Sequence, residues 1–194
     1  CVYYRMGEES VYQHWMHIAD AADLPFFIYN IPQLTGFNLS VSLVKRMRRN
    51  ARVAGMKCSS DPVKDIMTFK EAGGEDFLIF TGEDKQFIAG YLMGAEGGIG
   101  GTYGAMPELY LKMEELIHRG EWEKARQVQN LVNPLITRLG SFPSMYGAVK
   151  SIITLGGCPM GDPRLPFLPV STTDPALIDL QHDIAKTVES VREL

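Results

Sequence analysis

The sequence is poor in cysteine and contains no long uninterrupted hydrophobic run. Its three cysteines, Cys1, Cys58 and Cys158, form no paired framework and no Cys-x-x-Cys motif. A disulfide-stabilised fold is therefore not expected, and a reduced, cytoplasmic setting is the default. Because no apolar stretch reaches the length of a bilayer-spanning helix and no signal peptide is recognisable, we expect no membrane partner.

An excess of basic residues is also absent. The chain has 19 lysines and arginines against 23 acidic residues, which gives a formal net charge of −4. That balance offers no basic surface for nucleic acid or anionic lipid, so we expect neither as a partner. With 194 residues, of which 45% are hydrophobic, the chain can bury a large core and lacks the composition of a disordered segment.

Strand-like and helix-like patterns alternate along the first half of the chain. We predict strands at 26–29, 53–57, 77–81 and 97–102, and helices at 8–22, 41–49, 62–72 and 85–93. Ser40 is the expected N-cap of the second helix, and residues 32–38 are an expected loop. After Pro107 the pattern is purely helical, over 108–119, 121–139, 143–155 and 175–192. These patterns indicate an α/β fold of successive βα units followed by helices.

A tyrosine and a lysine stand at the ends of two of the predicted strands. Tyr29 ends the first and Lys57 the second. Burial penalises the ammonium form of a lysine, so a buried lysine can present a free amine that attacks a carbonyl and forms a Schiff base. A phenol both donates and accepts protons, so Tyr29 can serve that chemistry, which is typical of class I aldolases. The alternatives are a salt-bridged or solvent-reaching Lys57 and a packing role for Tyr29.

Four motifs carry a family resemblance. They are Tyr-Asn-Ile-Pro-Gln-Leu-Thr-Gly at 29–36, Gly-Met-Lys-Cys-Ser-Ser at 55–60, Thr-Gly-Glu-Asp at 81–84 and Gly-Gly-Ile-Gly-Gly-Thr-Tyr at 97–103. Their order and spacing resemble the pyruvate-dependent aldolases of the dihydrodipicolinate synthase and N-acetylneuraminate lyase family. Within that family the fourth motif and residues 158–166 are more similar to the sialic-acid lyases.

The resemblance implies a fold. We expect residues 1–106 to form the C-terminal half of a (β/α)8 TIM barrel, and residues 107–194 to form its last helix and a C-terminal helical extension. A complete barrel typically needs about 250 residues, and this chain begins at Cys1 without a methionine. We therefore expect the N-terminal units, with the family's Gly-Thr-Thr-Gly type motif for the pyruvate carboxylate, to be absent from this sequence.

The resemblance also implies a mechanism in which Lys57 forms a Schiff base with pyruvate or a sugar acid and Tyr29 relays the proton. No metal or organic cofactor is then required. One of Tyr3 and Tyr4 is implied to cross into a neighbouring subunit of a homotetramer, a dimer of dimers, although interface packing is the alternative for both. The implied substrate-binding residues are Ser59, Gly82, Asp84, Lys85, Ile99 and Gly101.

Three positions depart from the family pattern. Leu34 stands where the synthases carry an arginine, Lys85 where sialic-acid lyases typically carry glutamate, and Gly101 where they tend to carry serine. The sequence therefore predicts the reaction type more firmly than the substrate. The alternatives are a 4-hydroxy-tetrahydrodipicolinate synthase, a keto-deoxy-sugar-acid aldolase or dehydratase, and a catalytically idle sugar-acid-binding or scaffold protein.

Several of these residues have simpler interpretations. Asp84 is a candidate helix N-cap, and Ser59 is a candidate turn-capping residue. The glycines at 97–101 are not followed by the Gly-Lys-Ser/Thr of a phosphate loop. His14 and His17 are half of a metal site at most, because no third ligand is suitably spaced. By strand alternation, Cys58 is expected to point away from Lys57.

Overall fold

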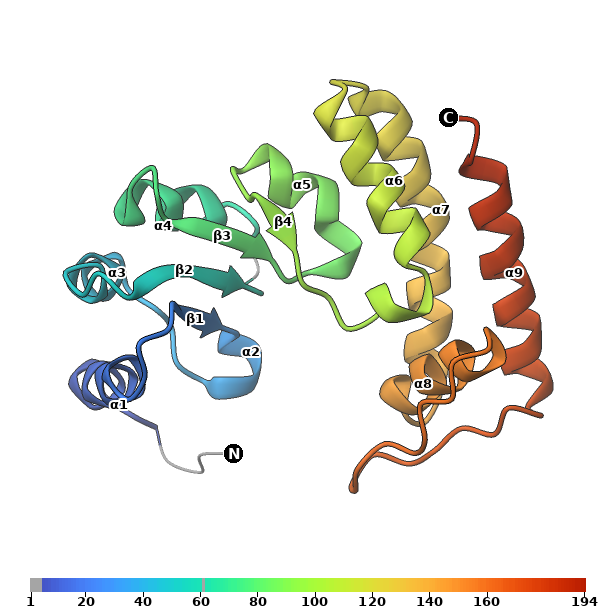
Figure 1. Ribbon diagram of the computed structural model, residues 1–194, viewed down its shortest axis with the longest axis horizontal. Coiled ribbons are helices and arrows are strands. Elements are labelled where there is room, and N and C mark those ends of the chain that lie inside the picture. Colours follow the sequence, from blue (N-terminus) through green and yellow to red (C-terminus); the bar gives the residue numbers. More distant parts are fainter. Residues whose placement is uncertain (1–4, 61) are drawn as a thin grey trace. The chain divides into compact units, whose positions relative to one another are not determined.

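The computed structural model describes residues 5–60 and 62–194, which divide into two compact units (Figure 1). Of the described residues, those up to Ile99 form the sheet unit, and residues 100–194 form the helical unit. None of the helices in the described ranges is both long enough and apolar enough to cross a membrane.

The sheet unit alternates strands and helices as the sequence predicts. Its elements are α1 (Glu8–Asp20), β1 (Phe26–Asn30), α2 (Pro32–Thr35), α3 (Val41–Met47), β2 (Val53–Cys58), α4 (Asp65–Gly73), β3 (Leu78–Thr81), η1 (Asp84–Gln86), α5 (Phe87–Leu92) and β4 (Gly97–Gly98). The expected N-cap is confirmed, because the Ser40 hydroxyl accepts the Leu43 N–H.

Several sequence-based boundaries differ from the structure. The segment expected to be a loop contains the one-turn helix α2, which starts with proline at its first position and is capped at its C-terminal end by Gly36. The helix expected from Pro62 begins at Asp65, after a turn. The glycine-rich strand is only two residues long, Gly97–Gly98, instead of the six expected from the sequence.

The four strands form one parallel sheet in the order β1-β2-β3-β4. Tyr29 is paired with Lys57, and Phe27 with Gly55, but Phe26 is paired with Val53, so the register skips Ala54. Because of this irregularity, the buried side chains of β1 and β2 lie on the same face of the sheet, and Tyr29 and Lys57 lie together on the other. Gly55 leaves no room for a side chain, since a Cβ there would overlap the Leu78 carbonyl and lie 2.6 Å from Cε1 of the Phe27 ring.

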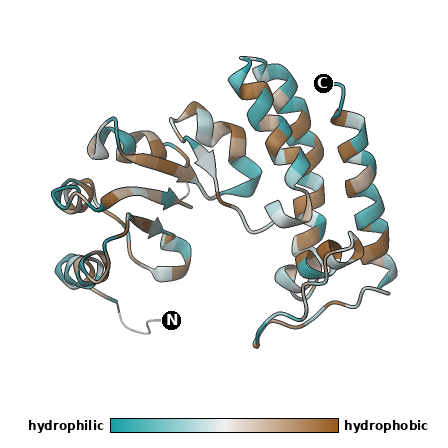
Figure 2. Ribbon diagram, viewed as in Figure 1, coloured by the Kyte–Doolittle hydropathy of each residue, from teal (hydrophilic) through white to brown (hydrophobic). Residues whose placement is uncertain are grey.

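Helices cover one face of this sheet. The core between them and the strands consists of fully buried side chains that point away from Tyr29 and Lys57, and Figure 2 shows the hydrophobic colouring of β2 and β3. Its largest members are Ile28, Leu43, Met47, Met56, Ile66, Phe77 and Ile79. Burying such a side chain contributes about 1.5–3 kcal/mol, so this face holds the unit together.

The opposite face is uncovered within the sheet unit. Phe27 is 38% exposed, Tyr29 50% and Leu78 40%, and Phe27 packs against the Phe80 ring at 5.8 Å. The strand alternation therefore places Tyr29 on an open surface, while its neighbours Ile28 and Asn30 are buried among the helices.

The helical unit contains η2 (Tyr103–Ala105), α6 (Pro107–His118), α7 (Trp122–Ser141), α8 (Met145–Leu155) and α9 (Pro175–Val191). Leucine, valine and methionine side chains from these helices form its core. Arg138 on α7 bonds to Asp179 at 2.7 Å and to Asp183 at 2.5 Å, which ties α7 to α9. Asp174 caps α9 by accepting the N–H groups of Ala176 and Leu177.

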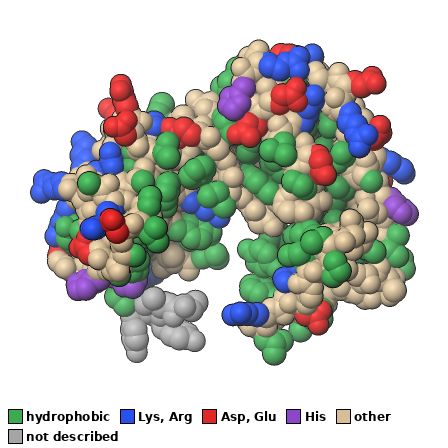
Figure 3. Space-filling model, viewed as in Figure 1, with side chains coloured by type: hydrophobic (Ala, Val, Ile, Leu, Met, Phe, Trp, Pro, Cys, Tyr) green, Lys and Arg blue, Asp and Glu red, His purple; other side chains and the backbone are tan. Residues whose placement is uncertain are grey.

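A charged contact joins α1 to α3. Glu9 pairs with Arg46 at 2.5 Å, and the Arg46 guanidinium lies 3.5 Å from the centre of the Tyr12 ring. The hydrogen bonds that Arg46 and Gln13 donate hold the pKa of Glu9 at about 2, below its usual 4.5. In Figure 3, acidic and basic side chains are interspersed on the face in view.

The low pKa of Glu9 predicts a pH-dependent stability. A depressed folded-state pKa stabilises the fold above about 4.5, and this contribution is lost as the pH falls toward about 2. Glu9→Gln should therefore lower the thermal midpoint of unfolding at neutral pH. The difference in midpoint between the variant and the wild type should shrink as the pH falls from about 4.5 to about 2. In an Arg46→Gln background, Glu9→Gln should change the thermal midpoint little. An undiminished change there would show that the Glu9–Arg46 pair is not the cause.

Candidate active site

Tyr29 and Lys57 contact each other on the open face of the sheet. Lys57 Nζ donates a 3.2 Å hydrogen bond to Tyr29 Oη and lies 4.3 Å from the centre of the tyrosine ring. The contact follows from the register, because directly paired residues of parallel strands project to the same side. Within residues 5–60 and 62–194, Lys57 belongs to no ion pair, so the salt-bridged alternative is not found.

The next side chain on this face is Ser59. Ser59 is 4% exposed, and its hydroxyl has no hydrogen-bond partner among the described residues. A buried hydroxyl left without a partner costs about 1–3 kcal/mol, and it is typical of a site that receives a polar ligand. No turn-capping hydrogen bond of the Ser59 side chain is found among the described residues.

Because Gly82 has no side chain, it leaves room for the side chains of Lys57 and Ser59. A Cβ at Gly82 would overlap Ser59 Oγ and lie 2.8 Å from Lys57 Cε. Gly82 is held at this position because its N–H donates to the Cys58 carbonyl at 2.8 Å. The glycine after β3 is thus required by the close approach of two side chains from β2.

The backbone beside Ser59 is also held from β1. The Ser59 N–H donates to the Asn30 carbonyl at 2.9 Å, and Gln33 Nε2 donates to the Ser59 carbonyl at 2.5 Å. Sequence reasoning missed Gln33, because nothing in the spacing between Gln33 and Ser59 indicates that the two residues meet.

Two of the expected substrate-binding residues, Asp84 and Lys85, lie in the short helix η1 after β3. Asp84 is the first residue of η1, and Glu83 occupies the N-cap position of that short helix. Lys85 is exposed on the same turn. Ile99 is 47% exposed, and its N–H donates to the Thr81 carbonyl at 2.9 Å, which extends the pairing of β3 with β4.

The last expected site residues are Gly101, Tyr3 and Tyr4. Gly101 belongs to the helical unit, where a Cβ would lie 3.3 Å from Met145 Cε and 3.5 Å from the Tyr146 ring. Tyr3 and Tyr4 lie outside the described residues.

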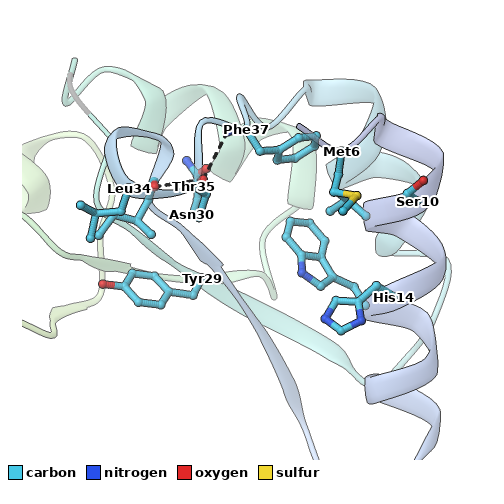
Figure 4. Close-up of a pocket in the computed structure, with 11 residues that line it drawn as sticks. Met6, Ser10, His14, Tyr29, Asn30, Leu34, Thr35 and Phe37 are labelled. Atoms are coloured by element: carbon cyan, nitrogen blue, oxygen red, sulfur yellow. Dashed lines mark hydrogen bonds between the residues drawn. The ribbon is translucent and has the colours of Figure 1, made fainter. Parts of the chain in front are cut away.

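A cavity of about 640 Å³ lies beside Tyr29, between α1 and α2 (Figure 4). Figure 4 shows Tyr29 and Leu34 toward one end of the cavity, and Met6 and His14 toward the other. The lining is mostly apolar, and the Trp15 and Phe37 rings meet edge to face.

The residues considered for metal binding do not converge. His14 lines the cavity, whereas the His17 ring bonds to the Gln13 carbonyl at 2.7 Å. Across the described part of the chain, no group of three or more His, Cys, Asp or Glu side chains is arranged to hold a metal ion. Cys58 points away from Lys57 as predicted, and its sulfur lies 3.0 Å from Ser60 Oγ.

Comparison with known proteins places these features in a wider context. Residues 2–182 match the model of the dihydrodipicolinate synthetase family. The chain is 44% identical to an N-acetylneuraminate lyase of Mediterraneibacter gnavus, over 95% of this chain and 58% of that protein. It is 30% identical to a 4-hydroxy-tetrahydrodipicolinate synthase of Chlorobium luteolum, over 94% of this chain and 62% of that protein.

The solved structures agree on the fold. The Ruminococcus gnavus sialic acid aldolase matches with a TM-score of 0.93 and 40% identity, over 98% of this chain and 64% of that chain. The expected fold, part of a (β/α)8 barrel followed by C-terminal helices, is confirmed. The chain spans less than two thirds of the length of each of these relatives.

The packing around Gly82 yields a test of the site geometry. Gly82→Ala should destabilise the fold by about 1–3 kcal/mol, the usual cost of overpacking, because the new methyl group overlaps Ser59 Oγ. Adding Ser59→Ala removes that oxygen and should recover part of the loss, as measured by urea unfolding. Equal losses from Gly82→Ala in both backgrounds would show that the two residues do not compete for space.

Proposed function

The chain belongs to the dihydrodipicolinate synthetase family, and we propose that it carries the carbon–carbon lyase chemistry of a pyruvate-dependent class I aldolase. The observation that carries the proposal is the 3.2 Å hydrogen bond between Lys57 Nζ and Tyr29 Oη on an open face. An amine beside a phenol suits attack on a keto group followed by proton transfer, and the Ser59 hydroxyl close by has no partner among residues 5–60 and 62–194.

The proposed cleavage begins at Lys57. Its neutral amine attacks the C2 keto carbon of the substrate, and the hydroxyl of the adduct leaves as water with a proton from Tyr29, which gives a protonated imine and a tyrosinate. Tyr29 takes the proton from the C4 hydroxyl as the bond between C3 and C4 breaks, and the electron pair of that bond moves into the imine. An aldehyde leaves and an enamine remains. Protonation of the enamine and hydrolysis of the imine release pyruvate and restore the amine.

We propose a sugar acid such as N-acetylneuraminate as the substrate. Support comes from the 44% identity to an N-acetylneuraminate lyase, against 30% to a synthase. Leu34 adds support, because an exposed leucine cannot hold a substrate carboxylate as an arginine can. Lys85 is the feature that favours a different tail, since its ammonium prefers an anion or a carbonyl to a polyol.

The remaining features of the proposal concern cofactor and assembly. No metal or organic cofactor is needed, because the protonated imine accepts the electron pair itself. We further propose a cytoplasmic homotetramer, a dimer of dimers, in which Tyr3 or Tyr4 reaches a neighbouring subunit. The free thiols of Cys58 and Cys158 are consistent with a reducing compartment.

Borohydride reduction in the presence of pyruvate tests the nucleophile. The reduced imine should add the three-carbon unit covalently at Lys57, as located by peptide mass spectrometry. Lys57→Met should abolish the labelling, whereas Lys85→Met, which removes an exposed lysine near the site, should retain it. Labelling at another lysine, or none in the wild type, would overturn the aldolase proposal.

Substitution of Tyr29 tests the proton relay. Tyr29→Phe keeps the ring beside Lys57 but removes the hydroxyl, so the variant should still form the imine with pyruvate. Cleavage of the sugar acid should slow by about 10²–10⁴-fold, the usual contribution of a general acid–base. Single-turnover kinetics separate the two steps. Near-normal cleavage would leave Tyr29 with a packing role only.

A further inference from the structure

We propose that Gln33 is a positioning residue that aims the Ser59 hydroxyl at the substrate beside the imine. The inference rests on the proposed function and adds a residue to it. Gln33 belongs to none of the strands, yet its side-chain amide spans from α2 to the end of β2 and donates to the Ser59 carbonyl at 2.5 Å.

Two hydrogen bonds from the same side fix the backbone of Ser59. Its N–H donates to the Asn30 carbonyl at 2.9 Å, and its carbonyl accepts from Gln33. Both partners belong to the segment that follows Tyr29 directly. Ser59 comes after the last residue of β2, so its carbonyl has no ladder partner from the neighbouring strands and depends on a side chain for orientation.

The donor is itself held in place. Gln33 lies in α2, which is closed by the bond from the Gly36 N–H to the Pro32 carbonyl at 2.8 Å. The Thr35 hydroxyl adds a 3.1 Å bond to the Ile31 carbonyl. The amide of Gln33 is thus carried by a short, internally bonded turn, which limits the directions from which it can reach Ser59.

The group that Gln33 positions is the Ser59 hydroxyl. It is buried, has no partner among the described residues, and occupies the space above Gly82 next to Lys57 Cε. A keto acid joined to Lys57 brings its oxygens to this end of the lysine side chain. If the Ser59 carbonyl lost Gln33, the peptide between Ser59 and Ser60 would be free to rotate, and the hydroxyl would lose its fixed direction.

Gln33→Met tests the inference, because methionine keeps the length of the side chain and removes the N–H donor. The kcat/KM for sugar-acid cleavage should fall by about 3–10-fold, the size of one hydrogen bond, while borohydride trapping of pyruvate at Lys57 is retained. Gln13→Met is the matched control: it makes the same change on α1, where the glutamine bonds to Glu9 at 2.8 Å, and should leave kcat/KM unchanged.

A double-mutant cycle separates positioning from loop stability. In a Ser59→Ala background Gln33→Met should have no further effect on kcat/KM, because the hydroxyl through which it acts is gone. Equal losses in both backgrounds would overturn the inference, since Gln33 would then act without Ser59.

Amide hydrogen exchange provides a readout that does not depend on catalysis. The Ser59 amide should exchange faster in Gln33→Met and at the wild-type rate in Gln13→Met; unchanged exchange in Gln33→Met would overturn the inference. If the wild type fails to trap pyruvate, the proposed function fails, and the exchange rate alone then decides whether Gln33 holds Ser59.

Discussion

The register between β1 and β2 is the constraint on which the rest of the site depends. Skipping Ala54 brings Tyr29 opposite Lys57, whereas an unbroken register from Phe26 and Val53 would bring it opposite Met56. Met56 is fully buried among the helices, so that pairing would put one residue of each pair on the wrong face. The hydrophobic core on one face therefore enforces the contact between phenol and amine on the other.

The carboxyl ends of the strands build the site mainly through backbone hydrogen bonds. Ser59 bonds back to β1, Gly82 to β2 and Ile99 to β3, so each strand end is tied to its predecessor. These three backbone hydrogen bonds fix the directions in which the neighbouring side chains project, and they need no charged groups to do so. The site consequently combines a stable frame with a hydroxyl that has no partner in the described part of the chain, a combination more typical of ligand binding than of a closed core.

The sequence was sufficient to predict the βα units, the cap at Ser40 and the places of Tyr29 and Lys57 at the ends of successive strands, because these features depend on local patterns. It could not predict the irregularity at Ala54 or the bond from Gln33 to Ser59. Both arise from contacts between segments far apart in the chain. The sequence also predicts too long a β4. Its apolar, glycine-rich pattern is typical of a strand over 97–102, but only Gly97 and Gly98 form the strand. The order of the strand ends placed Tyr29 and Lys57 at the same edge of the sheet, but their direct pairing depends on the irregularity at Ala54.

We propose above all that a keto acid becomes joined to Lys57, with Tyr29 and Ser59 around it. A crystal structure of the protein grown with pyruvate tests this most directly. We predict continuous electron density from Lys57 Nζ to the C2 atom of pyruvate, with Tyr29 Oη and Ser59 Oγ within hydrogen-bonding distance of the adduct. A Lys57 side chain that remains unmodified and bonded to Tyr29, with pyruvate absent or bound elsewhere, would contradict the account.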